Sequence, residues 1–334
     1  MKNERYLNLL LSVHGLLMCL GCCCVCVEAR AGVKGNVEVG VDVENKNNTK
    51  VDVEAELKFK SKRAAGLQAE VEAKASGVDR DAHLEDVLVD YRFSKKLHIN
   101  LGYSKKILGL EYEQGKQTRL SIHRSSMYRK MESLGLVGRQ INLRLEAKLG
   151  KKKKRLFLSA ALGGDNSRDY NLQFSIKKRF RDLGVGVWTL LEQHRIDKDF
   201  MTVYAEVASA WYETDAGKVT LEVIHGVDAI RTEYLSLLKK DRTVHFLCPK
   251  MDMAKFITLG KETALVPFVQ AGMVFDDLDN AADNSLLFAA GTRFQWHGLR
   301  IGLNVEAIGV KDPTKKNHRD FHRRSFYGQV IYFF

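Results

Sequence analysis

Apolar and polar residues alternate strictly along most of this sequence, and that pattern restricts the folds open to it. The run VEVGVDVE places Val37, Val39, Val41 and Val43 on one side and acidic residues on the other. The run TKVDVEAELKFK repeats the pattern after the connection NKNN. A period of two residues indicates a β-strand with one apolar and one polar face. Because Asn-rich connections favour tight turns, the two runs predict a β-hairpin.

About sixteen such runs follow one another to the C-terminus, and their connections alternate loosely between short and long. The faces opposite the apolar ones carry Glu, Lys, Arg or Asp at almost every step. Charges at this density cannot line a small dry core without being left unpaired, whereas a wide water-filled lumen accepts them. The predicted fold is therefore all-β: a transmembrane antiparallel β-barrel of about sixteen strands, with its apolar face toward lipid.

The last run, SFYGQVIYFF, ends on Phe334, with Tyr332, Val330 and Gly328 at every second position before it. Free C-termini are usually polar and frayed, so this ending needs an explanation. We expect it to be the closing strand, paired with residues 37–43, so that no strand edge is left unpaired in the bilayer. These four residues would then face lipid. The terminal aromatic resembles the C-terminal signature that outer-membrane proteins present to the barrel assembly machinery.

The N-terminus has the features of an export signal. Lys2 and Arg5 precede an apolar run over residues 7–27, and Ala29-Arg30-Ala31 fits a small-x-small cleavage site. We therefore predict a cleaved signal peptide over residues 1–31 and a barrel domain over residues 32–334. A single transmembrane anchor is the alternative, because the run approaches spanning length. Leu20-Gly21-Cys22 gives a weaker lipoprotein alternative.

Only one cysteine lies outside the predicted signal peptide. Of the 6 cysteines, Cys248 alone falls in residues 32–334. A single thiol cannot form an internal disulfide or a cysteine-rich metal site. No metal site and no cofactor are predicted.

The longest interruption of the alternation lies at about residues 105–139. Connections of that length are usually functional or disordered. Most of the charges in this one are positive, and the part from Ser121 to Leu134 has weak helical spacing.

A family resemblance appears in the same region. The stretch GYSKKILGLEYEQ, followed by LSIHRSSMYRK and GLVGRQINL, resembles the phosphate-selective porin O and P family. In that family a strand ending in Gly-aromatic-x-Lys leads into a Gly-Leu-Glu segment, an inward-folded loop and an Arg-containing return to the next strand. The resemblance is sharpest from about Leu97 to Leu145. It implies a sixteen-stranded barrel, commonly a homotrimer, whose third loop narrows the pore.

These observations predict a porin of the bacterial outer membrane that lets small hydrophilic solutes diffuse passively, with a preference for anions such as phosphate. Arg and Lys in a constriction replace the lost hydration of an anion with charge-assisted hydrogen bonds and repel cations. The expected partners are small anions, outer-membrane lipids and the assembly machinery. The candidate constriction and anion-binding residues are Lys116, Arg119, Arg124, Arg129 and Arg139 in the loop and Arg92, Arg144, Lys177, Arg293 and Arg300 on strands.

Three other classes of function fit the sequence less well. No HExxH, GxSxG or defensible Ser-His-Asp grouping indicates an enzyme, so no catalytic residue is proposed. A formal charge of +12 and the basic run at residues 151–155 would suit nucleic acid, but an exported strand-rich chain does not. A surface adhesin built on a barrel stays open as an alternative.

Acidic residues on the early strands, such as Glu38, Glu56 and Glu72, would also point into the lumen.

Overall fold

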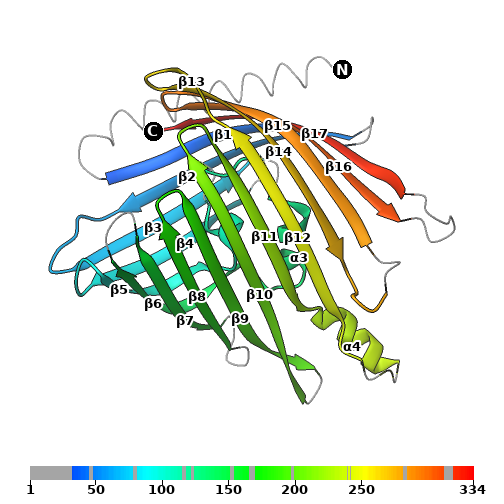
Figure 1. Cartoon of the computed structure of the whole chain (residues 1–334). Coiled ribbons are helices and arrows are strands. Elements are labelled where there is room, and N and C mark those ends of the chain that lie inside the picture. Colours follow the sequence, from blue (N-terminus) through cyan, green and yellow to red (C-terminus); the bar gives the residue numbers. More distant parts are fainter. Residues whose placement is uncertain are drawn as a thin grey trace.

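The computed structural model describes residues 32–44, 48–77, 81–114, 118–121, 124–150, 154–164, 170–196, 199–238, 240, 242–280, 284–311 and 319–334. The predicted signal peptide lies outside these residues. The described residues form a closed antiparallel β-barrel (Figure 1). Its strands are β1 (Gly32–Glu44), β2 (Asn48–Lys60), β3 (Leu67–Ser76), β4 (Asp81–Arg92), β5 (Leu97–Lys105), β6 (Arg139–Leu149), β7 (Leu156–Gly164), β8 (Asn171–Phe180), β9 (Leu183–Ile196), β10 (Asp199–Thr214), β11 (Gly217–Val227), β12 (His245–Lys255), β13 (Ile257–Gly260), β14 (Thr263–Phe275), β15 (Asn284–Trp296), β16 (Leu299–Lys311) and β17 (Arg319–Phe333).

The barrel wall has sixteen crossings, as the alternation predicts. The strands β12 and β13 both pair with β14 and are separated only at Phe256, so they are two parts of one crossing. The other named strands each cross the wall once. Closure occurs between β1 and β17, where Val37 pairs with Tyr332 and Val41 pairs with Gly328. The predicted closing strand is therefore confirmed.

Side-chain orientation follows the predicted alternation along β6. Leu143 and Leu145 point outward and are 47% and 45% exposed, whereas Asn142 and Arg144 are buried inside. At the end of β17, Val330 and Tyr332 also point outward. Phe334 differs from the prediction: it stacks on Tyr332 but also lines an internal cavity. The ring lies over Gly35, which pairs with Phe334 through the backbone and has no side chain to occupy that space.

The expectation of a polar inner face on nearly every strand is wrong for β9 to β12. Many of the inner side chains there are apolar and fully buried, beside polar anchors such as Glu222 and Lys250; the apolar ones include Trp188 and Leu190 on β9, Val207 on β10, Ile224 on β11 and Phe246 on β12. They pack against Met127, Tyr128, Met131 and Leu136, which belong to the connection between β5 and β6. The apolar inner face is stable because this connection covers it, so that part of the lumen is a packed core.

Among the described residues, three helices accompany the barrel: α2 (Leu110–Glu113), α3 (Ser126–Ser133) and α4 (Ala229–Leu237). The first two lie inside the barrel, and α4 lies at the end opposite the chain's C-terminus (Figure 1). No helix in the described part of the chain is long and apolar enough to cross a membrane.

Candidate pore constriction

The connection between β5 and β6, residues 106–138, is called the lumen loop below. Both of its helices lie within the barrel (Figure 1). The backbone N–H of Leu110 donates a hydrogen bond of 2.8 Å to Glu222 on β11, and the Tyr128 hydroxyl donates one of 2.6 Å to the same carboxylate. One wall residue thus holds the start of α2 and the middle of α3.

Ion pairs add further anchors between the lumen loop and the wall. The Lys106 ammonium lies 3.0 Å from Glu192 on β9, and both side chains are almost fully buried. The other pairs join Glu111 to Lys250, Arg129 to Glu306, and Lys130 to Asp228 and Asp276. Breaking a buried pair by removing one partner leaves an uncompensated charge and costs about 3–5 kcal/mol. These pairs therefore fix where the lumen loop sits.

Glu111 stays ionised although it is buried. Burial acts to raise its pKa, but the Lys250 ammonium and hydrogen bonds from the backbone and hydroxyl of Ser125 outweigh burial. The net result is a pKa below the ordinary value of 4.5. The anchor to Lys250 is therefore charged on both sides at neutral pH.

Opposite the packed wall, an open space remains between the lumen loop and strands β1 to β5. It has a volume of about 510 Å³ and is called the lumen cavity below. Seven basic side chains line it against four acidic ones. The basic ones are Lys34, Lys58, Lys74, Lys105, Arg119, Arg124 and Arg139, and the acidic ones are Glu56, Glu72, Glu85 and Asp86.

Most charges of the lumen cavity are held by partners. Arg139 donates to Asp86 at 2.9 Å and also binds Glu85, and Lys58 lies 3.0 Å from Glu72. Arg124 pairs with Glu132 and lies 4.3 Å from the centroid of the Tyr112 ring. Paired side chains keep fixed positions, so the charges form an ordered lining.

Lys105, like Lys34, differs from the paired side chains of this lining. Its ammonium forms no ion pair or hydrogen bond with any residue that the structure describes. It lies at the end of β5, next to Arg139 in the register with β6. An ammonium without a carboxylate partner can still offer its donors to a solute.

The ten predicted residues fall into four groups. Arg119, Arg124 and Arg139 line the lumen cavity. Arg129 belongs to an anchor, and Lys177 pairs with Glu113 beside a second cavity. Arg144 donates to the backbone carbonyl of Lys105, just before the lumen loop, and Arg293 and Arg300 donate to that of Arg119 in the middle of the loop. Arg92 is exposed at the end of β4, and Lys116 lies outside the described residues.

Sequence reasoning did not select Lys34, Lys58, Lys74 or Lys105 as site residues. The lysines on β2 and β3 alternate with apolar residues, and this alternation predicts that they point inward. Whether they line the cavity depends on where the lumen loop lies, which the alternation does not predict. Lys105 was harder to assign. Alternation along β5 would direct it outward with Leu101 and Tyr103, yet β5 ends there and the chain turns inward.

The barrel with an anchored internal loop is the architecture of an outer-membrane porin. Residues 33–180 match the model of the family described as phosphate-selective porin O and P. The match includes the stretch from Leu97 to Leu145 and agrees with the resemblance seen in the sequence.

Solved structures agree on the fold. The chain is similar to an outer membrane protein of Vibrio cholerae, OmpT lacking loop L8, with a TM-score of 0.64 and 9% identity over 91% of this chain and 99% of that one. It is also similar to an anion-selective porin from Comamonas acidovorans, with a TM-score of 0.62 and 9% identity over 91% of this chain and 99% of that one. For the trimer form of Vibrio cholerae OmpT the TM-score is 0.59 and the identity is 10%, over 91% of this chain and 99% of that one. No curated protein matches the sequence.

Proposed function

We propose that the protein is a channel of the bacterial outer membrane through which small hydrophilic solutes diffuse passively, with a preference for anions such as phosphate. The observation that carries this proposal is the lumen cavity, in which seven basic side chains face four acidic ones beside an anchored loop. A local excess of positive charge raises the concentration of anions at a narrow point and lowers that of cations.

Arginine gives this lining a preference for oxyanions. The planar guanidinium can bind two oxygens of one anion, and Arg119, Arg124 and Arg139 all border the cavity. Lys105 adds an ammonium that forms no ion pair or hydrogen bond with a described residue. A phosphate or carboxylate passing the loop would exchange water for these donors.

A channel accounts for the polar groups inside the barrel better than an enzyme does. The buried polar groups of the lumen loop are used in contacts with the wall, and among the described residues no group of three His, Cys, Asp or Glu could hold a metal ion. We also propose a homotrimer, in line with the trimer form of the similar Vibrio cholerae protein.

The proposal is tested by planar-bilayer recording of refolded, heat-modifiable protein. In a potassium chloride gradient the zero-current potential should show anion preference, and phosphate should compete with chloride. Absence of any conductance would refute the channel, and a cation preference would refute the anion assignment.

Two variants with the same change in charge locate the selectivity. Arg139→Gln removes a charge from the lumen cavity, whereas Arg129→Gln removes one from an anchor that does not line it. One charge about 8 Å from a permeating ion is worth roughly 0.5 kcal/mol in water, with opposite signs for an anion and a cation, so Arg139→Gln should lower the anion-to-cation permeability ratio about fivefold. Arg129→Gln should change the ratio less; equal shifts would count against the cavity as the selective element.

A further inference from the structure

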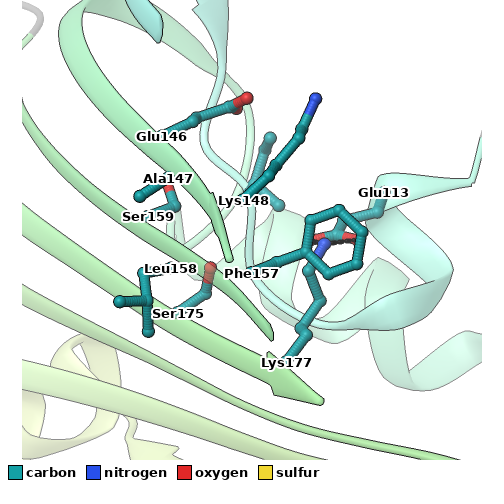
Figure 2. A pocket seen from close by; sticks show the side chains of 10 residues that line it. Glu113, Glu146, Ala147, Lys148, Phe157, Leu158, Ser159, Ser175 and Lys177 are labelled. Carbon is teal, nitrogen blue, oxygen red and sulfur yellow. Dashed lines mark hydrogen bonds and ion pairs between the residues drawn. The ribbon is translucent and has the colours of Figure 1, made fainter. Parts of the chain in front are cut away.

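A second cavity of about 250 Å³ lies beside Glu113 of α2, against strands β6, β7 and β8. Its lining includes Glu146 and Lys148 on β6, Phe157 on β7, and Ile107. Figure 2 shows the Phe157 ring beside the Lys177 ammonium and the Glu113 carboxylate, with Glu146 and Lys148 extending from β6. We call this space the side cavity.

The strand register arranges the side cavity in two rows. Lys148 pairs with Phe157, which pairs with Lys177, so these three side chains lie in one row across the wall. In the next row, Glu146 pairs with Ser159. Side chains two residues apart on one face of a strand are separated by about 6.6–6.8 Å. Glu146 and Lys148 therefore flank one small volume from the same strand.

Two of the four charges in the side cavity neutralise each other. Lys177 lies 2.8 Å and 2.6 Å from the two oxygens of Glu113, and Glu113 also accepts a hydrogen bond of 2.9 Å from the indole N–H of Trp188. The same ammonium lies 5.5 Å from the centroid of the Phe157 ring. This pair is built into the wall and positions the ring.

The other two charges remain available. The side chains of Glu146 and Lys148 form no ion pair or hydrogen bond with each other or with any other residue in the described part of the chain. Arg144 and Glu146 interact through their charges, while the Arg144 guanidinium is bound to the Lys105 carbonyl. The side cavity thus presents one carboxylate, one ammonium and an apolar surface of Phe157 and Ile107.

We propose that the side cavity is a second solute subsite, selective for small zwitterions with an apolar side chain, such as an α-amino acid. A solute with only a negative charge is attracted by Lys148 but repelled by Glu146. A solute with only a positive charge is attracted by Glu146 but repelled by Lys148. An amino acid satisfies both, because its ammonium and carboxylate lie on the same carbon atom, and its side chain can contact the Phe157 ring. The volume of about 250 Å³ suits a solute smaller than a drug-sized ligand.

This subsite differs in chemistry from the lumen cavity. Its lining holds two acidic and two basic side chains, whereas the lumen cavity has an excess of basic ones. The inference rests on the proposed function in one respect, since the solute reaches the side cavity through the open barrel.

Calorimetric titration of the refolded, detergent-solubilised barrel tests the subsite. The probes are phenylalanine, 3-phenylpropionate, which lacks the ammonium, and 2-phenylethylamine, which lacks the carboxylate. Phenylalanine should bind about tenfold more tightly than either single-charge probe, because each of those probes lacks one of the two charged groups and therefore one charge-assisted hydrogen bond. Glu146→Gln should reduce the affinity for phenylalanine to that for 3-phenylpropionate, and Lys148→Gln should reduce it to that for 2-phenylethylamine.

A charge-exchanged variant with Glu146→Lys and Lys148→Glu keeps the net charge and sharpens the test. Exchanging the positions of the two charged groups at the α-carbon inverts its chirality, so the enantiomer of phenylalanine that the wild-type protein prefers should become the less favoured one. The control is Lys178→Gln, which changes an adjacent lysine on β8 that does not line the side cavity.

Two results would overturn the subsite: phenylalanine binding no tighter than either single-charge probe, or affinities unchanged in both Gln variants. Conductance of the same preparations separates this inference from the proposed function. A conducting, anion-preferring barrel without phenylalanine binding refutes only the subsite. A barrel that binds phenylalanine but does not conduct refutes only the channel.

Discussion

Tyr128 on α3 donates a hydrogen bond of 2.6 Å to Glu222 on β11, and both side chains are buried where the lumen loop meets the wall. The same carboxylate accepts the Leu110 N–H at 2.8 Å and the Ser209 hydroxyl. A buried carboxylate with several donors is stable only while the donors stay in place. Glu222 therefore makes the position of the lumen loop depend on the wall strands.

Replacing Tyr128 with Phe should weaken this anchor without changing the shape of the side chain. The carboxylate of Glu222 loses one donor, and the free energy of unfolding in urea should fall by about 1.5–3 kcal/mol. Open-channel current noise should rise, because the loop is held less firmly. The control is Tyr234→Phe on α4, where the side chain is 63% exposed and the expected change is within about 0.5 kcal/mol. Equal stability of both variants would contradict the anchoring role.

Removing Lys250 should make the channel sensitive to mild acid. In the wild-type protein the pKa of Glu111 lies below 4.5, since Lys250 and Ser125 outweigh burial. A lowered pKa means that the stabilisation is complete above the ordinary pKa of the carboxyl group and is lost as the pH falls through its value in the folded protein. The contact between Glu111 and Lys250 in the wild-type protein should therefore be the same at about pH 7 and about pH 5, so that it adds no pH dependence to the conductance.

In Lys250→Met, burial is no longer opposed by the ammonium, so the pKa of Glu111 should rise. Its carboxyl group then takes up a proton at mildly acidic pH, and the seating of the lumen loop should change between about pH 7 and about pH 5. The measurement is single-channel conductance and its noise at both pH values. A variant whose conductance is as independent of pH as that of the wild type would show that Lys250 does not set this pKa.

Two glycines of the lumen loop allow a matched test of how tightly it is packed. Gly109 and Gly135 have φ angles of +88° and +72°, so alanine is strained at both by about 1–2 kcal/mol. A Cβ atom at Gly109 would collide with the Tyr128 hydroxyl, whereas one at Gly135 meets nothing within 4 Å. Gly109→Ala should therefore lower the urea midpoint clearly more than Gly135→Ala. Similar losses would indicate that only the backbone strain matters.

The wall of the barrel was predictable because each strand carries its own evidence. In β6 the alternation of Leu143 and Leu145 with Asn142 and Arg144 fixes which face meets lipid, and no distant contact is needed to read it. The closing strand was predictable for the same reason. Even the break at Phe256 lies within a run that the alternation treats as one strand.

The interior was less predictable because it depends on contacts between distant segments. The run GVGVWTLLE is apolar on both faces from Gly184 to Leu191, which is a signal of burial on both sides. That run does not say what covers Trp188. Arg129 and Arg139 are equally basic in the sequence, yet one belongs to an anchor and the other lines the lumen cavity. Only the path of the lumen loop distinguishes them.

Variants of Phe334 can test the stability of the barrel and its assembly in cells independently of each other. The backbones of Phe334 and Gly35 exchange two hydrogen bonds of 3.1 Å, and these extend the nine residue pairs that already join β1 to β17. Each backbone hydrogen bond contributes only about 1 kcal/mol net, so deletion of Phe334 should leave refolding in detergent nearly intact. Assembly in cells should nevertheless fall sharply if the assembly machinery reads the terminal aromatic.

Phe334→Ala distinguishes the two causes, because it keeps both backbone hydrogen bonds and removes only the ring that stacks on Tyr332. If the aromatic is the signal, this variant and the deletion should both give little heat-modifiable barrel in outer-membrane fractions while both refold in detergent. If barrel closure is what matters, only the deletion should be impaired, and it should be impaired in detergent as well. Normal assembly of the deletion in cells would show that Phe334 serves neither purpose.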